Sequence, residues 1–338
     1  MRIVRWVSGD HEAIRACHEV NGAADHLDDP AGPPTSVRTV EVLLTRPPGP
    51  AQTWFVPGET PGTAQAFYHL RLPDMENLTM GYLYLVVHPR FRRHGIGGAL
   101  LRHAARQAAA NERSLLATAV RRGSAGEAFA RHAGATPGIA EARRVQVLAK
   151  LRSGQVAALR ELAARAAVGY SLLCWTGRTP DEHLAGLAAV HNAMQDAPRT
   201  AGHEPSVWDA PRVRERIDDQ RELFGTRGYS VVARHDATGE LAAVTQIEVD
   251  PEYPEWAYQQ ITAVARPHRG HRLGLLVKAA MLEWLAVAEP RLQRILTGNA
   301  TANSHMISIN EALGYELLDP QPQGYDLPVA DALALGST

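Results

Sequence analysis

The stretch that decides the fold reads Val87-His-Pro-Arg-Phe-Arg-Arg-His-Gly-Ile-Gly-Gly98. The residues before it, 80–87, are β-branched and aromatic, which predicts a buried strand. The residues after it, to about 111, are rich in alanine and leucine, which favours a helix. A glycine-containing turn between a strand and a helix exposes free backbone N–H groups, and the helix dipole adds to their attraction for an anion. The sequence therefore predicts an anion-binding turn.

The same arrangement occurs again at Val264-Ala-Arg-Pro-His-Arg-Gly-His-Arg-Leu-Gly274. A predicted strand at 258–264 precedes this second turn, and a predicted helix begins at Leu273. Arg92 and Arg269 take the same place in the two copies and lie 177 residues apart in a chain of 338 residues. One such turn is a weak signal, because an ordinary basic surface turn explains it equally well. Two copies in register favour two copies of one fold.

Arg92-x-x-Gly95-x-Gly97, preceded by Val-x-Pro, resembles the acyl-CoA signature of the GNAT acetyltransferase superfamily. In that family the backbone of this turn holds the CoA pyrophosphate. The second copy departs from the signature, because Arg272 stands where the first glycine is expected. The resemblance implies two GNAT-like domains in tandem, a layout similar to that of mycothiol synthases. Each would be an α/β (α+β) domain with a central, mostly antiparallel mixed sheet flanked by helices.

On this resemblance we expect an N-terminal domain at 1–150, a helical connector at 151–168 and a C-terminal domain at 169–338. Each turn is then expected to bind acyl-CoA. In the first turn, the residues expected to bind acyl-CoA are Val87, Arg92, Arg93, His94, Gly95, Ile96, Gly97 and Gly98. Those of the second are Val264, Arg266, Arg269, Gly270, His271, Arg272, Leu273 and Gly274.

Residues 297–315 resemble a later segment of the family, in which an asparagine opens a helix that ends in Leu-Gly-Tyr. Asn303 and Asn310 share a face of this predicted helix, and both are candidates to bind the pantetheine arm of CoA. Helix capping explains Asn303 alone equally well. Many family members carry, at the position of Asn310, a tyrosine that protonates the CoA thiolate. His305 and Ser308 are the alternative acids in this segment.

In the first copy, the position of that tyrosine is taken by Ala130. The N-terminal domain is therefore expected to bind CoA without catalysing transfer, and the C-terminal domain is expected to be catalytic.

Transfer of an acyl group from a thioester to an amine requires a polarised carbonyl, a neutral amine and a leaving thiolate. By position in the family, the N–H of Val264 would polarise the carbonyl, and Val87 is its counterpart. Glu248, on the predicted strand 241–249, is the candidate general base, although a solvent-facing carboxylate is an equal alternative. We expect direct attack by the amine, because a covalent route needs an activated nucleophile beside a base. Cys174 lies far in sequence from the second turn, and no Ser–His–Asp pattern is apparent.

The candidate residues of the acceptor site are Asp196, Trp208, Gln260 and Thr262. Gln260 and Thr262 alternate on one face of the strand before the second turn, although they are equally explained as polar residues of the sheet. Asp196 is a candidate partner for a substrate ammonium group, and a turn residue before Pro198 is the alternative. Trp208 lies in the region that commonly shapes the acceptor site in the family.

The composition bounds the function further. A formal net charge of −1 argues against a broad nucleic-acid surface. The two cysteines, Cys17 and Cys174, fall in different halves and indicate no disulfide framework, which favours a cytoplasmic location. No spacing typical of a metal site and no apolar stretch of membrane-spanning length is present in the sequence. The N-terminal residues lack the apolar core of a signal peptide.

The leading interpretation is an N-acetyltransferase that uses acetyl-CoA as co-substrate and acetylates the primary amine of a small molecule. Two alternatives stay open. One is a related transferase that takes its acyl group from another carrier, such as an aminoacyl-tRNA. The other is a module that binds acyl-CoA without turnover.

Overall fold

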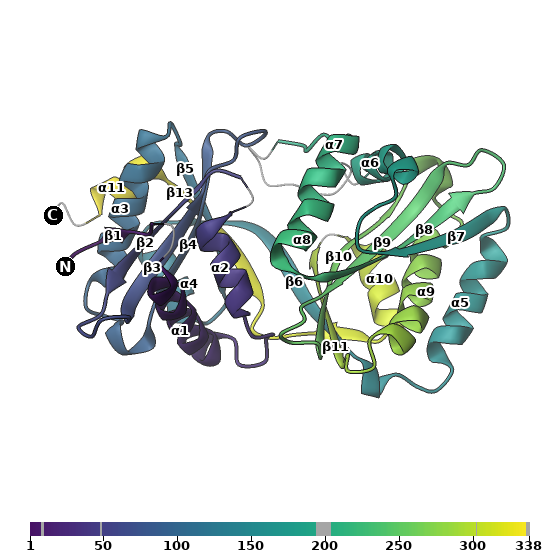
Figure 1. Ribbon diagram of the computed structural model, residues 1–338, viewed down its shortest axis with the longest axis horizontal. Coiled ribbons are helices and arrows are strands. Elements are labelled where there is room, and N and C mark those ends of the chain that lie inside the picture. Colours follow the sequence, from purple (N-terminus) through teal and green to yellow (C-terminus); the bar gives the residue numbers. More distant parts are fainter. Residues whose placement is uncertain (8–9, 48, 194–203, 302, 336–338) are drawn as a thin grey trace. The chain divides into compact units, whose positions relative to one another are not determined.

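The computed structural model describes residues 1–7, 10–47, 49–193, 204–301 and 303–335, with the backbone alone at 139 and 140 (Figure 1). The described chain forms two compact units. The first contains residues 1–141, 204 and 318–335, and the second contains residues 142–193 and 205–317. The units are therefore not consecutive stretches of the chain, in contrast to the boundaries expected at 150 and 168.

The sheet of the first unit has the order β1-β2-β3-β4-β5-β13-β6. The strands β4 and β5 are parallel, whereas β1–β2, β2–β3, β3–β4, β5–β13 and β13–β6 are antiparallel pairs. The strand bounds are β1 Val4–Arg5, β2 Ala51–Pro57, β3 Ala64–Arg71, β4 Met80–Val87, β5 Leu115–Arg121, β6 Thr136–Val147, of which the first part lies here, and β13 Pro322–Pro328.

Helices cover both faces of this sheet (Figure 1). One face packs against α1 (His11–Asp28) and α2 (Val37–Thr45), and the other packs against α3 (Ile96–Ala110) and α11 (Val329–Ala334), with the end of α4 (Ala125–His132). The helix α1 begins after Asp10, whose carboxylate accepts a hydrogen bond from the Ala13 N–H at 2.9 Å and so caps the helix. A short 3₁₀ turn, η1 (Pro89–Phe91), leads from β4 into the first glycine-rich turn.

The sheet of the second unit has the order β7-β8-β9-β10-β11-β6-β12, in which the second part of β6 takes part. Here too the strands that flank the glycine-rich turn and its helix, β10 and β11, are parallel. The strand bounds are β7 Tyr170–Thr176, β8 Arg227–His235, β9 Leu241–Val249, β10 Trp256–Val264, β11 Arg294–Ala300 and β12 Tyr315–Leu317.

The second sheet is also covered on both faces. Residues of α5, α9 and α10 pack on one face, and residues of α6, α7 and η5 pack on the other. The bounds are η2 Leu148–Lys150, α5 Gln155–Ala166, η3 Asp181–His183, α6 Leu184–Asn192, α7 Ala210–Val213, η5 Arg214–Asp218, α8 Asp219–Phe224, η6 Arg266–His268, α9 Leu273–Ala288 and α10 Ser304–Ala312.

Each sheet is completed by a strand and a helix that are distant in sequence from the rest of the unit. In the second sheet, the second part of β6 lies next to β11 and is followed by α5, whose Ala163 is fully buried. In the first sheet, β13 lies next to β5 and is followed by α11. The segment 151–168, expected to be a connector, therefore contributes to the core of the second unit. The expected fold class, tandem mixed and mostly antiparallel sheets with helices, is confirmed.

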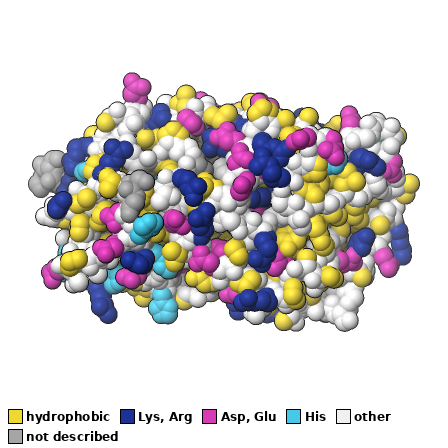
Figure 2. Space-filling model, viewed as in Figure 1, with side chains coloured by type: hydrophobic (Ala, Val, Ile, Leu, Met, Phe, Trp, Pro, Cys, Tyr) yellow, Lys and Arg dark blue, Asp and Glu magenta, His cyan; other side chains and the backbone are white. Residues whose placement is uncertain are grey.

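The surface and the helices give two further results. On the face shown in Figure 2, basic and acidic side chains are interspersed. Within the described ranges, no helix has the length and apolar character needed to cross a membrane.

Candidate acyl-CoA and acceptor site

The first glycine-rich turn presents six consecutive backbone N–H groups, those of residues 93–98. The described residues provide no hydrogen-bond acceptor for them, and the first turn of a helix has none of its own. Gly95, the N-cap of α3, has a φ of 77° and no side-chain cap, and Arg93 has a φ of 68°. Arg93 and His94 are exposed beside these groups. The turn therefore combines free donors, a helix N-terminus and positive charge, as an anion site requires.

Arg92 was expected to bind the cofactor, but its side chain forms hydrogen bonds within the protein. Its Nε donates to the Val87 carbonyl at 3.1 Å, and its two terminal nitrogens donate to the Asp28 carboxylate at 3.1 and 2.6 Å. The side chain thus ties the end of β4 to the end of α1. The backbone N–H groups of the turn, unlike the guanidinium of Arg92, therefore have no partner among the described residues and are open to an anion.

The second turn repeats this geometry closely. The N–H groups of residues 270–275 have no acceptor within the described chain, and Arg269 Nε donates to the Val264 carbonyl at 3.4 Å. Arg272 is the N-cap of α9 and adopts the left-handed conformation, with a φ of 55°, that Gly95 adopts in the first turn. The departure from the family signature therefore leaves the shape of the turn intact, at the modest cost of a left-handed arginine.

In each unit, the strand before the turn separates from its parallel neighbour. The strand β4 pairs with β5 over Met80–Tyr82, and β10 pairs with β11 over Trp256–Tyr258. The N–H of His88 donates to Gln65, and the N–H of Ala265 donates to Ala242. Because N–H directions alternate along an antiparallel pair, the N–H groups of Val87 and Val264 point away from that partner, toward the open edge. Leu83 and Leu85 share this direction with Val87.

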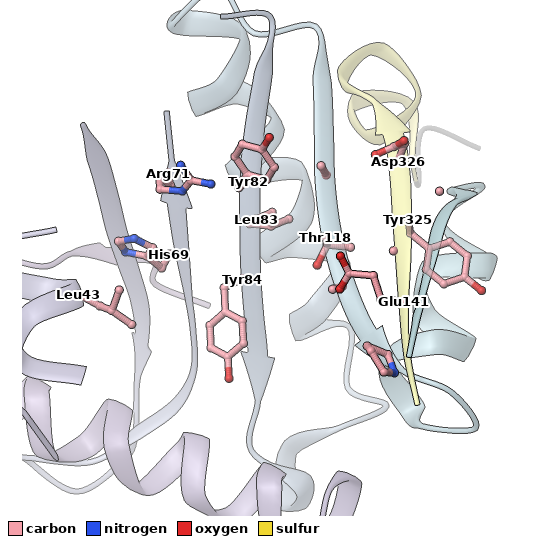
Figure 3. A pocket seen from close by; sticks show the side chains of 15 residues that line it. Leu43, His69, Arg71, Tyr82, Leu83, Tyr84, Thr118, Glu141, Tyr325 and Asp326 are labelled. Atoms are coloured by element: carbon pink, nitrogen blue, oxygen red, sulfur yellow. The ribbon is translucent and has the colours of Figure 1, made fainter. Parts of the chain in front are cut away.

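A cavity of about 440 Å³ lies in the first unit where β4 and β5 separate (Figure 3). Its walls come from α2 and from β3, β4, β5, β6 and β13. The lining residues are Leu43, His69, Arg71, Tyr82, Leu83, Tyr84, Ala117, Thr118, Ala119, Gly138, Glu141, Pro322, Gly324, Tyr325 and Asp326. The open edge of β4 runs from this cavity to the first turn, so an extended ligand held at the turn is directed into the cavity.

The polar groups that line the cavity differ in charge. Burial, and secondarily Arg71, lowers the pKa of His69 to about 4, so its ring is neutral near pH 7. The ring Nδ1 of His69 lies 2.9 Å from the hydroxyl of Thr53. The guanidinium of Arg71 lies over the ring of Tyr82, 4.2 Å from its centre. Burial raises the pKa of the Tyr84 phenol well above its usual value.

Tyr84, Glu141 and His69 were not among the residues expected to form the site. The available signal was the alternation of Tyr82 and Tyr84 on the strand before the turn, which places both on one face. Glu141 enters the site through the pairing of β6 with β13, which no local pattern indicates.

In the second unit, the expected base Glu248 is held in an ion pair. Its Oε1 lies 2.9 Å from Nε of Arg221, whose side chain is 4% exposed. Its Oε2 accepts from the Thr226 hydroxyl at 3.4 Å and from Gln260 Nε2 at 3.3 Å. Arg221 Nη2 is buried and has no hydrogen-bond partner among the described residues. These contacts favour a structural role for Glu248, as the counter-ion of a buried arginine.

We expect Glu248→Gln to lower the free energy of unfolding by about 3 kcal/mol, because the change leaves the buried guanidinium of Arg221 without a counter-ion. Urea unfolding of the full chain measures this loss. The double variant with Arg221→Met is the control and should recover most of it. A loss below about 0.5 kcal/mol, the range of ordinary surface substitutions, would contradict the structural role.

Most of the other residues expected to form the site in the second unit make hydrogen bonds within the protein. The Thr262 hydroxyl pairs with that of Thr245 at 2.8 Å, and the Trp208 backbone exchanges two hydrogen bonds with the side chain of Asn192. Asn303 caps α10 by accepting from the Met306 N–H at 3.2 Å. Asp196 lies outside the described residues.

Asn310 is buried, and its Nδ2 donates to Asn299 Oδ1 at 2.8 Å, whereas its own Oδ1 is buried and has no partner in the described part of the chain. The side chains of His305 and Ser308 are exposed, and the Ser308 hydroxyl donates to the Ser304 carbonyl. In the first unit, Ala130 is buried in the corresponding helix, α4.

A buried lysine lies where β10 and β11 separate. Lys278 is 3% exposed, its Nζ donates to Gln259 Oε1 at 2.8 Å, and it lies 4.9 Å from the centre of the Tyr315 ring. Burial lowers the pKa of this lysine to about 7.

We expect Lys278→Met to stabilise the protein most below pH 7. An unfolded lysine has a pKa of about 10.4, so between pH 7 and 10 the unfolded state binds more protons. The wild-type chain therefore gains stability as the pH rises through this window, and the advantage of Lys278→Met shrinks. Urea unfolding at pH 6 and pH 9.5 measures the difference. An equal difference at both pH values would refute the low pKa of Lys278.

Comparisons with known proteins agree with this geometry. Residues 52–134 match an acetyltransferase (GNAT) domain. A tandem GNAT protein of the clavulanic acid biosynthesis pathway is 28% identical, with 97% of this chain and 98% of that chain covered and a TM-score of 0.79. A GCN5-related N-acetyltransferase from Sphaerobacter thermophilus is 14% identical, with 97% and 95% covered and a TM-score of 0.66. A search of curated proteins gives no significant match. Within the described part of the chain, no group of side chains is suited to hold a metal ion.

Proposed function

Because the chain is a member of the GNAT acetyltransferase superfamily with two GNAT folds in tandem, we propose that it transfers an acetyl group from acetyl-CoA to the primary amine of a small molecule. The observation that carries this proposal is the continuous arrangement in the first unit. There, a turn with six free N–H groups, the open edge of β4 and a cavity follow one another. An acyl carrier with phosphates at one end and a thioester at the other suits such an arrangement.

We further propose that the first unit carries the reaction, in reverse of the assignment expected from the sequence. Two observations support this choice. The first turn matches the family signature fully and leads to a cavity. In the second unit, the carboxylate expected to act as base is paired with Arg221. The second turn, residues 264–274, keeps its six free N–H groups and is proposed to bind acyl-CoA as well.

In the proposed mechanism, the N–H groups of residues 93–98 hold the CoA pyrophosphate. The N–H groups along the open edge of β4, which include those of Leu83, Leu85 and Val87, bind the pantetheine arm and polarise the thioester carbonyl. The amine in the cavity attacks the carbonyl carbon, the C–S bond breaks, and CoA leaves as a thiolate. The cavity is lined by two carboxylates, those of Glu141 and Asp326, and we propose that Glu141 accepts the proton released by the amine, directly or through water.

We propose direct attack, with no acyl-enzyme. Cys17 is buried in α1, and Cys174 lies on β7 of the second unit; neither is among the residues that line the cavity. Burial raises the pKa of both thiols, which lowers their reactivity. Mass spectrometry after incubation with acetyl-CoA alone tests this step. A stoichiometric acetyl adduct that an amine removes would contradict direct attack.

The function itself is tested in two steps. Thermal shift with acetyl-CoA measures binding, and release of free CoA thiol over a panel of amines measures turnover. We expect stabilisation by acetyl-CoA and amine-dependent thiol release. Binding without turnover over the whole panel would indicate an acyl-CoA-binding module, and the absence of both would indicate another acyl carrier.

A further inference from the structure

We propose that the cavity of the first unit selects a monoamine with an apolar body, and that Tyr84 and Glu141 bind its ammonium group. This inference rests on the proposed function and names the substrate class of the same site. It follows from three properties of the cavity: a phenol that can only accept hydrogen bonds, a carboxylate that has no partner among the described residues, and mostly apolar walls.

The hydroxyl proton of Tyr84 is already used in a hydrogen bond within the protein. Its hydroxyl donates to Oδ1 of Asn21, a side chain that is 2% exposed. Asn21 cannot turn its amide around, because its Nδ2 donates to Asp25 Oδ2 at 2.7 Å and to Thr35 Oγ1 at 3.1 Å. The Thr35 hydroxyl in turn donates to Asp25 at 3.2 Å. This network fixes Oδ1 as the acceptor of the Tyr84 proton, so the phenol offers only its lone pairs to the cavity.

Glu141 adds a second acceptor to the same cavity. Its carboxylate has no ion pair and no hydrogen bond among the described residues. The cavity is also lined by a second carboxylate, that of Asp326, and by one guanidinium, that of Arg71, so its acidic side chains outnumber its basic ones. His69 is neutral, and the guanidinium of Arg71 stacks on Tyr82. Two acceptors, one of them negatively charged, favour an ammonium group, which has donors and no acceptor.

Most of the remaining wall is apolar, and its polar exceptions are His69, Arg71, Thr118 and Asp326. Leu43, Leu83, Ala117, Ala119 and Pro322 line the cavity together with the ring of Tyr82. A volume of about 440 Å³ falls within the usual range of small-molecule sites, roughly 300–1,000 Å³, and leaves room for more than an ammonium group. Hydroxyl groups against these walls would lose their hydrogen bonds to water, which disfavours amino sugars. An apolar body against the same walls is stabilised by burial.

The test compares 2-phenylethylamine and hexylamine with glucosamine and putrescine as acceptors for the full chain with saturating acetyl-CoA. We expect kcat/KM for the two apolar monoamines to exceed that for glucosamine and putrescine by at least about tenfold. Calorimetry of 2-phenylethylamine with the CoA-bound protein measures the same preference without turnover.

Two variants test whether Tyr84 and Glu141 bind the ammonium group. Tyr84→Phe and Glu141→Gln are each expected to raise KM for 2-phenylethylamine by about five- to tenfold and to leave KM for acetyl-CoA unchanged. Glu141→Gln is expected to lower kcat as well, because it removes the proposed proton acceptor. Asn21→Leu frees the Tyr84 proton and tests the positioning role of Asn21, with the same rise in KM for the amine and an unchanged kcat expected. Glu59→Gln, at an exposed turn of the same unit, is the matched control.

The outcomes separate the inference from the proposed function. Faster acetylation of glucosamine or putrescine than of the apolar monoamines would overturn the inference and leave the acetyltransferase function standing. If acetyl-CoA binds and no amine is acetylated, the function fails, and calorimetry still decides the inference. Binding of 2-phenylethylamine that weakens in Tyr84→Phe and Glu141→Gln would support the inference, whereas equal or absent binding would overturn it.

Discussion

Gly95→Asp is expected to abolish acetyl-CoA binding at the first turn and, with it, turnover. The φ of 77° at Gly95 lies in the left-handed region, which aspartate tolerates better than most residues, and a Cβ there meets no atom within 4 Å. The fold should therefore be retained. The new carboxylate would lie beside the phosphates, where two unit charges 4 Å apart repel by about 4 kcal/mol at an effective dielectric constant of about 20. We expect kcat/KM for acetyl-CoA to fall at least about 100-fold.

Two matched variants show which of the two units is catalytic. Gly95→Asn has the same shape without the charge and should lose far less activity. Arg272→Asp places the same carboxylate at the equivalent N-cap of α9, where it should remove binding at the second turn and lower turnover far less. Calorimetry counts the acetyl-CoA sites, and thiol release measures turnover. If Arg272→Asp abolished turnover and Gly95→Asp did not, the second unit would be the catalytic one, as the sequence predicts.

The repeated turn could be predicted because its signal is local. The transition from an apolar strand through glycine and arginine to an alanine-rich helix lies within about thirty residues in each copy. The structure has β4 at Met80–Val87 and α3 at Ile96–Ala110, close to the predicted limits. The tandem GNAT fold followed from this signal and is confirmed, and residues 52–134 match an acetyltransferase (GNAT) domain.

The roles of charged residues could not be predicted in the same way. The partners of Arg92 and Glu248 are Asp28 and Arg221, which lie 64 and 27 residues away in sequence. Whether a carboxylate is a base or a counter-ion depends on which side chain the fold brings to it, and no local pattern contains that information. The same reason hid Tyr84, whose proton is committed through Asn21, a residue on a different element.

The short elements at the end of the chain were also missed. The elements β12, β13 and α11 were not predicted. In β13 the sequence signal is weak, because the strand contains Pro322, Gly324 and Pro328, and proline and glycine are rare inside strands. Its position is set by pairing with β5 along the register Leu327–Leu116, between segments about two hundred residues apart. Two similar halves also offer each closing strand two equivalent positions, and the order along the chain does not say which of them it takes.

Deletion of residues 318–338 is expected to unfold the first unit. This deletion removes β13 from between β5 and β6, and with it Tyr325, Leu327 and Val329, each at most 5% exposed. Burial of each such side chain stabilises by about 1.5–3 kcal/mol, and the backbone hydrogen bonds of β5 and β6 to β13 are lost as well. The sum approaches the whole stability of an ordinary domain, roughly 5–15 kcal/mol.

Hydrogen exchange of the truncated chain tests this expectation against the full chain. The amides of β4 and β5 should lose their protection, whereas those of β8 and β9, which belong to the second unit, should keep most of theirs. Leu327→Pro in the full chain removes one central hydrogen bond and should act in the same direction, while Leu333→Ala, at a side chain that is 37% exposed, is the control. Undiminished protection of β4 and β5 in the truncated chain would mean that the first unit closes without β13. If protection is lost, the cavity of the first unit forms only once the last strand of the chain has paired, because Pro322, Gly324 and Asp326 of that strand are part of its wall.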